Sequence, residues 1–175
     1  MQALSERRSV REFSSRELSS QILSNLLWAA FGVTRPDGRR TAPSAMNRQT
    51  VDVYVVQAGG ASIYDAANNQ LLPVATADLR SATGTQDYVG QAPLNLVYVS
   101  DYSKMGNASE IDKAGTAGAE TGFIGQNVYL YCASEGLATV IRGSIDKGPL
   151  AKALKLKPEQ HIVLAQTVGY PKASQ

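Results

Sequence analysis

Apolar residues recur at intervals of four between residues 21 and 31, a spacing typical of a helix with one buried face. They form two neighbouring rows: Ile22, Leu26, Ala30, Leu23, Leu27 and Phe31. Ser19 and Ser20 can cap the start of this segment, and Gly32 is a typical stop signal. The pattern therefore predicts a helix over 21–31 that packs against the core of the protein.

A second pattern, of alternating or continuous apolar residues, predicts β-strands. Residues 52–57 alternate and are rich in β-branched and aromatic side chains, as in a half-buried strand. Residues 94–100 are almost continuously apolar, which is typical of a strand covered on both faces. The remaining predicted strands are shorter, and they cover 61–64, 70–74, 139–141 and 161–168.

The longest predicted helix covers 115–137. It begins with small residues and continues through a segment that is apolar or aromatic on nearly every side. A helix of this kind needs partners all round, so we expect it at the centre of an oligomer. The alternative is a helix that breaks near Gly122 or Gly125 and is buried within one subunit. Together with short helices over 1–8 and 146–154, the order of elements favours an α+β fold over a regular βαβ alternation.

Length and charge narrow the possible functions. The chain has 175 residues, enough for one domain with a substantial core, and we expect a single domain over 1–175. Net charge is only +2, but residues 1–48 hold eight of the ten arginines against four acids. This concentration of positive charge is either a solvated basic face or a site for an anionic ligand. A nucleic-acid partner is not expected, because the arginine-rich segment lacks interleaved aromatic residues.

Other residue counts exclude several classes of protein. The single cysteine, Cys132, rules out an internal disulfide framework and a multi-thiolate metal site. The single histidine, His161, leaves little basis for a histidine-based metal site or a catalytic triad. No segment approaches the ~20 apolar residues of a membrane helix, so we expect no membrane partner. The unpaired cysteine and the polar start of the chain favour a cytoplasmic location, unless an export signal has been removed.

Two short segments carry the candidate chemistry. Arg7, Arg8, Ser9 and Arg11 place three guanidinium groups and a hydroxyl close together, and arginine binds phosphate through paired hydrogen bonds. The segment 43–49 is small and polar, with amide side chains suited to hydrogen-bonding a flat heterocycle. The two segments together indicate a flavin mononucleotide (FMN) site and hence an oxidoreductase.

Four segments in order resemble the FMN-dependent nitroreductase family, and they span almost the whole chain. Each is weak alone, but the ordered set is much more specific. They cover 7–13, 42–49, 125–127 with 131–137, and 168–171. The resemblance implies an α+β sandwich with a mainly antiparallel sheet flanked by helices. It also implies a homodimer with the long helix at its interface and two FMN molecules bound there.

The resemblance further implies which residues hold the cofactor. Arg7, Arg8, Ser9 and Arg11 of one subunit would bind the phosphate and the polar edge of the ring. The other subunit would line the isoalloxazine and ribityl side with the second segment, namely Pro43, Ser44, Ala45, Met46, Asn47 and Gln49. The turn after the long helix would place backbone amides near the ring, at Ile141, Arg142 and Gly143.

Two departures from the family pattern bear on this site. An acidic residue commonly precedes the glycine that corresponds to Gly143, whereas this chain has Arg142, which we expect to bring positive charge toward the flavin. Many relatives end with a basic pair that reaches the phosphate, whereas this chain offers only Lys172. The phosphate would then depend on Arg7, Arg11 and Lys172, or the tail is abbreviated.

The chemistry implied by the resemblance is carried by the flavin, so no side chain is expected to act as a nucleophile. NADH or NADPH would reduce the flavin, which would pass electrons to a small-molecule acceptor in a ping-pong mechanism. Acceptors in the family include nitroaromatics, quinones and activated alkenes. Two alternatives keep the same fold: a flavin-dependent oxidase or dehydrogenase similar to the azoline oxidases, and a non-enzymatic flavin-binding protein.

Overall fold

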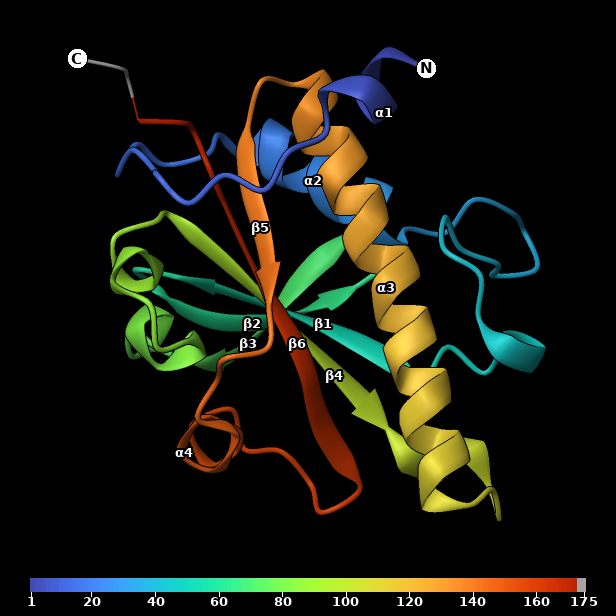
Figure 1. The fold of residues 1–175 in the computed structure, drawn as a ribbon. Coiled ribbons are helices and arrows are strands. Elements are labelled where there is room, and N and C mark those ends of the chain that lie inside the picture. Colours follow the sequence, from blue (N-terminus) through green and yellow to red (C-terminus); the bar gives the residue numbers. More distant parts are fainter. Residues whose placement is uncertain (173–175) are drawn as a thin grey trace.

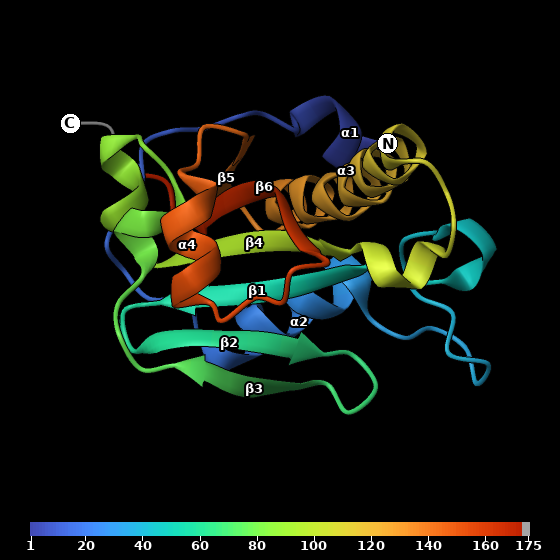
Figure 2. The same ribbon diagram turned by 90° about the horizontal axis from the view of Figure 1, so that it is seen from below.

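A six-stranded sheet forms the centre of residues 1–172, the part of the chain that the computed structural model describes. Its strand order is β3-β2-β1-β4-β6-β5, and every neighbouring pair is antiparallel. The strands are β1 (Val51–Gln57), β2 (Gly60–Asp65), β3 (Gln70–Ala75), β4 (Leu94–Asp101), β5 (Ala138–Arg142) and β6 (Gln160–Gly169). Figure 2 shows β1 and β4 side by side in the middle of this sheet.

Helices cover both faces of the sheet (Figures 1 and 2). α2 (Ser20–Phe31) and α3 (Glu110–Ser134) lie on one face, and α4 (Lys147–Ala153) lies on the other. α1 (Gln2–Glu6) packs against α3. Short 3-10 helices occur in the connections: η1 (Ala45–Asn47), η2 (Arg80–Thr83), η3 (Asp87–Gly90) and η4 (Tyr102–Met105).

The alternation of side chains along the strands divides the core into two parts. Val53 and Val55 of β1 pack with α2 and α3, whereas Tyr54 and Val56 pack with α4. Residues 94–100 of β4 are all buried, which confirms the predicted strand covered on both faces. The antiparallel sheet flanked by helices confirms the predicted α+β fold.

Helix α2 begins and ends close to its predicted bounds. The Ser19 hydroxyl accepts a hydrogen bond from the backbone N–H of Ile22 at 3.3 Å and so caps the first turn. Gly32 ends the helix, and a side chain at that position would overlap Trp28. The serine cap and the glycine stop both lie next to the helix in the sequence, so the sequence alone predicts the bounds of α2 closely.

Helix α3 is longer at its start than the sequence pattern predicts. It begins at Glu110 because the Ser109 hydroxyl accepts a hydrogen bond from the backbone N–H of Asp112 at 3.2 Å. It ends at Ser134 and is continuous, so the alternative of a helix broken near its glycines is wrong. Tertiary packing and this cap outweigh the low helix propensity of glycine.

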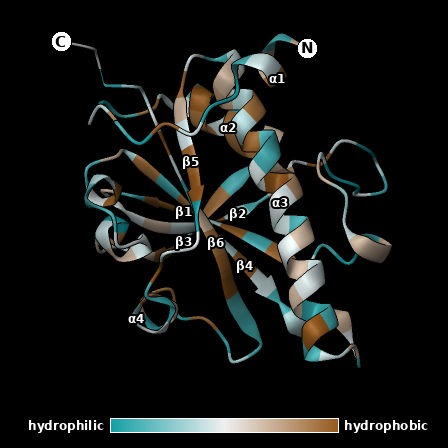
Figure 3. Ribbon diagram, viewed as in Figure 1, coloured by the Kyte–Doolittle hydropathy of each residue, from teal (hydrophilic) through white to brown (hydrophobic). Residues whose placement is uncertain are grey.

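One side of α3 is uncovered within a single chain, so this chain alone does not provide the burial all round that the sequence predicts in an oligomer. Gly118 and Gly122 are exposed, and Phe123 is 46% exposed. Figure 3 accordingly shows hydrophobic residues at intervals along α3 rather than continuously. None of the helices within residues 1–172 is both long and apolar enough to cross a membrane.

Candidate functional site

The arginine segment, residues 7–11, follows α1 and is held against β5 and α3. The backbone N–H of Val10 donates to the Thr139 carbonyl at 2.9 Å. The Ser9 hydroxyl lies 2.8 Å from the Tyr129 hydroxyl, and the Arg7 guanidinium lies 5.0 Å from the centre of the Tyr129 ring. Backbone, hydroxyl and cation–π contacts therefore fix the segment beside the edge strand.

The positive charges of this segment are not neutralised by protein acids. Within residues 1–172, Arg7, Arg8 and Arg11 form no ion pair. The backbone N–H of Lys172 donates to the Glu12 carbonyl at 3.2 Å, so the end of the described chain lies beside the arginine segment. The structure thus places the backbone of Lys172 near the part of the chain that carries Arg7, Arg8 and Arg11. Groups of uncompensated cations of this kind suit a dianion.

The second segment, a polar loop over 43–50, is anchored to α3 by one buried carboxylate. Glu120 is only 2% exposed. Its Oε1 atom accepts hydrogen bonds from the Ser44 hydroxyl and the Ala45 N–H, both at 2.9 Å. Its Oε2 atom accepts from the Thr50 hydroxyl at 2.7 Å and from the Thr50 N–H at 3.3 Å. Four donors therefore satisfy a buried charge that has no cationic partner in the described residues.

Sequence reasoning did not identify Glu120. The available signal is an acid in the middle of a helix that is otherwise small and apolar. Such an acid is rarely buried unless it is paired or fully hydrogen-bonded, so its position in the pattern marks it as a candidate anchor.

The polar loop has a strained backbone. Met46, Asn47 and Gln49 have φ values of 54°, 54° and 50°, in the left-handed region that non-glycine residues seldom adopt. The Gln49 N–H donates to the Ser44 hydroxyl at 2.7 Å, and the Gln49 amide donates to the Gly38 carbonyl at 2.9 Å. Strain that is held by surrounding contacts is typical of functional loops. The Gln49 amide thus ties the polar loop to the turn at Gly38, and it also donates to Asn47 Oδ1 at 3.1 Å.

A cavity of about 540 Å³ opens beside this loop, and four predicted residues line it: Pro43, Ser44, Met46 and Asn47. Arg40 and Thr41 also line it. The buried Nε atom of Arg40 and the buried Oγ1 atom of Thr41 have no hydrogen-bond partner within residues 1–172. Buried polar atoms without partners are uncommon and costly, so these two atoms mark an unsatisfied region next to the cavity.

In the third predicted segment, 141–143, a backbone N–H lies on the face of the sheet that α3 and Ser9 occupy. The charged side chain of Arg142 lies on the opposite face. The Ile141 N–H donates to the Tyr129 hydroxyl at 3.0 Å. Ile141 points toward α3, and the next side chain in the strand, Arg142, points to the opposite face of the sheet. The expectation that the Arg142 guanidinium projects toward the flavin is therefore corrected. Gly143, which follows the strand, is exposed.

The Arg142 guanidinium instead ties together three elements on the far face. It donates to the Thr83 carbonyl of η2, to Asn95 Oδ1 of β4 at 2.8 Å and to Thr167 Oγ1 of β6 at 3.1 Å. Arg142 is 8% exposed, and burial lowers its pKa to about 10. Its role in this structure is to hold the sheet to η2 (Arg80–Thr83) through hydrogen bonds.

The arginine segment and the polar loop lie on opposite sides of α3 (Figure 1). Neither a hydrogen bond nor an ion pair joins them within the described part of the chain. Tyr129 holds the first segment and Glu120 holds the second, at different heights of the same helix. One chain alone therefore does not bring the two segments into a single site.

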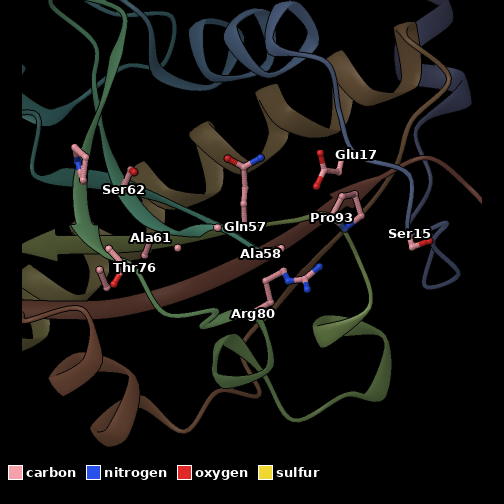
Figure 4. A pocket seen from close by; sticks show the side chains of 13 residues that line it. Ser15, Glu17, Gln57, Ala58, Ala61, Ser62, Thr76, Arg80 and Pro93 are labelled. Atoms are coloured by element: carbon pink, nitrogen blue, oxygen red, sulfur yellow. The ribbon is translucent and has the colours of Figure 1, made fainter.

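Another cavity, of about 510 Å³, lies at the turn between β1 and β2 and is shown in Figure 4. Its lining includes Gln57, Glu17 and Arg80, and none of the residues that the sequence predicts for the site. Arg80 pairs with Asp78 at 2.7 Å and donates to the Ala92 carbonyl at 3.1 Å. Arg80 in this cavity therefore already has an acidic partner, whereas the arginines of the arginine segment have none in the described chain.

The antiparallel sheet flanked by helices and the match to one family profile place the chain in a class of protein, the flavin-type oxidoreductases. The sequence profile of the Nitroreductase family matches residues 4–170. The chain therefore belongs to the nitroreductase family.

Individual proteins support this relationship. The chain is 30% identical to a Methanocaldococcus jannaschii protein, provisionally named nitroreductase MJ1384, over 95% of this chain and 88% of that protein. It is 40% identical to a provisionally named nitroreductase of Ralstonia eutropha JMP134, whose crystal structure matches with a TM-score of 0.94 over 99% of this chain and 83% of the other. A chain of the E. coli microcin synthetase McbBCD complex is 21% identical with a TM-score of 0.81, over 99% of this chain and 74% of its own length, which is a likeness of fold alone.

Proposed function

We propose that this protein is an FMN-dependent oxidoreductase that takes electrons from NADH or NADPH and reduces a nitroaromatic, a quinone or an activated alkene. The observation that carries the proposal is that one helix, α3, anchors both motif segments through buried side chains. Tyr129 contacts Ser9 in the arginine segment, and Glu120 binds Ser44 and Ala45 in the polar loop. Membership of the nitroreductase family supports the assignment.

The residues present fit FMN chemically. Arg7, Arg8, Arg11 and Lys172 are basic groups without ion pairs in the described chain, and they would hold the phosphate. In the segment 141–143, Arg142 and Gly143 would offer backbone amides to the ring, with the Arg142 side chain turned away. The Ile141 N–H is already bound by the Tyr129 hydroxyl. When bound, FMN supplies a ring that takes up a hydride and releases electrons again in a ping-pong cycle. The protein contributes binding, orientation and electrostatic stabilisation.

We propose further that the site is completed in a homodimer. The polar loop, with Pro43, Ala45, Met46 and Asn47, would meet the arginine segment of the other subunit. The exposed side of α3 supports this arrangement, because its glycines allow close approach and Phe123 is 46% exposed.

The test is the visible spectrum of the purified protein, followed by titration with NADH and with NADPH in the absence of oxygen. We expect a flavin band that bleaches with at least one of the two donors and returns when a nitroaromatic or quinone is added. A flavin band that bleaches with neither donor contradicts the reductase function.

The same experiment separates the alternatives. Flavin that is reduced by a heterocyclic peptide substrate and reoxidised by oxygen, without use of NAD(P)H, would identify an oxidase similar to the azoline oxidases. Protein that is colourless and stays colourless with added FMN would instead indicate a protein of the same fold that does not bind flavin.

A further inference from the structure

The Tyr129 hydroxyl connects two segments of the candidate site. It lies 2.8 Å from the Ser9 hydroxyl of the arginine segment and 3.0 Å from the Ile141 nitrogen of β5. Tyr129 is 7% exposed as a residue, and both hydrogen bonds of its hydroxyl are partly buried. These two protein neighbours are therefore the main constraint on the direction of the hydroxyl hydrogen.

Counting protons defines that arrangement. A tyrosine hydroxyl has one hydrogen to donate and two lone pairs to accept with. The Ile141 N–H can only donate, so Tyr129 accepts from it. If Ser9 also donated to Tyr129, the tyrosine hydrogen would be left without an acceptor among the described residues, at a cost of ~1–3 kcal/mol. The arrangement that satisfies every buried group has Tyr129 donating to Ser9.

This direction leaves the Ser9 hydrogen free. Ser9 is exposed, so its hydroxyl can turn that hydrogen toward a ligand. Two cations lie near it: Arg8 lines a cavity of about 250 Å³ together with Tyr129 and Glu6, and the Arg7 guanidinium lies over the Tyr129 ring. Glu6 forms no ion pair with either arginine within residues 1–172. A free hydroxyl donor among unpaired cations suits an oxyanion.

We infer that Tyr129 is a positioning residue, which orients the Ser9 hydroxyl as a hydrogen-bond donor to the phosphate monoester of the flavin. The inference rests on the proposed function and adds the direction of one hydrogen bond and the residue that sets it.

The test compares FMN with riboflavin, which has the same ring but no phosphate. Dissociation constants for both are measured on the apoprotein by quenching of flavin fluorescence. For Tyr129→Phe we expect FMN to bind about 5- to 10-fold more weakly, the loss of roughly one hydrogen bond, while riboflavin binding stays within ~2-fold. Tyr131→Phe is the matched control, because Tyr131 lies in the same helix and its hydroxyl donates to the Ile22 carbonyl at 3.4 Å rather than to Ser9.

Variants of Ser9 keep the inference testable if Tyr129→Phe does not fold. Ser9→Ala should weaken FMN binding by a similar factor and leave riboflavin unchanged, and Ser9→Thr, which keeps the hydroxyl, should retain FMN. The double variant should be no weaker than Ser9→Ala, because both changes remove the same donor.

Several outcomes would overturn the inference. FMN binding by Tyr129→Phe that equals wild type would do so, and so would equal losses for FMN and riboflavin, which indicate a merely structural role. A wild-type protein that binds neither flavin overturns the proposed function, and this assignment with it. Failure of the inference alone is recognised by wild-type FMN binding that the substitutions do not alter selectively.

Discussion

At the scale of single residues, Glu120 connects helix α3 to the polar loop through a buried carboxylate. Its carboxylate is buried without a cation, and it is stabilised only by donors from the polar loop. Such a group is costly to bury unless every lone pair is used. The four hydrogen bonds meet that condition, and in return they hold a loop with three left-handed residues.

We predict that Glu120→Gln destabilises the protein by about 1–3 kcal/mol, because an amide nitrogen would face the N–H of Ala45 or of Thr50. The free energy of unfolding is measured by urea denaturation. Glu135→Gln, on the exposed end of the same helix, is the control and should change stability by less than ~0.5 kcal/mol. Equal stability of the two variants would show that the buried carboxylate has no anchoring role.

Cys132 is the second residue with a measurable consequence. It is 1% exposed, and burial raises the pKa of its thiol, so the native protein holds almost no thiolate at pH 8. We predict that an aromatic disulfide reagent reacts at least about 100-fold more slowly with native protein than with urea-unfolded protein. Fast reaction of the native thiol would contradict this burial. Cys132 is thus a small buried residue of the core.

At the scale of elements, the sequence predicts best where both ends of an element carry local signals. Helix α2 has a serine cap and a glycine stop, and β4 has an unbroken apolar run, so both lie close to their expected bounds. The sequence pattern predicts the start of α3 five residues too late. The glycines near the start lower the helix signal there, although Ser109 caps the helix. Which face Arg142 occupies depends on strand register, and no local pattern in the sequence reports that register.

The buried Arg142 gives a prediction about how elements are held together. A methyl group at Gly84 would overlap the Arg142 guanidinium, which links η2 to β4 and β6. We predict that Gly84→Ala lowers the free energy of unfolding by about 1–3 kcal/mol. Gly59→Ala is the control: its methyl group meets nothing within 4 Å, and it should be neutral or stabilising by up to ~1 kcal/mol. A Gly84→Ala protein as stable as this control would show that the contact is not needed.

At the scale of the whole molecule, the described chain holds two incomplete halves of a site. The sequence identifies both halves, because their chemistry lies in contiguous residues. It does not reveal the anchors Tyr129 and Glu120, which are distant in the chain from the segments they hold. Anchors of this kind depend on tertiary packing, and a single sequence carries no pairwise signal for them.

The proposed dimer predicts complementation between damaged subunits. Arg11→Ala and Asn47→Ala homodimers should each lose FMN binding at both sites. When the two are mixed and allowed to exchange subunits, each hybrid regains one intact site, which is about a quarter of all sites after random exchange. Bound FMN is measured from the flavin absorbance of the re-isolated protein. No recovery, with subunit exchange demonstrated by mass, would mean that each site is built within one chain.

The double use of α3 has a genetic consequence. Glu120 and Tyr129 are nine residues apart, about 13 Å along the helix, and in the proposed dimer they serve different sites. A mutation confined to the arginine segment or the polar loop would be recessive, because a hybrid with a normal subunit keeps one working site. A mutation that distorts α3 removes support from both sites of the hybrid, and it would act dominantly. Mutations in α3 should therefore differ in dominance from mutations in the two binding segments.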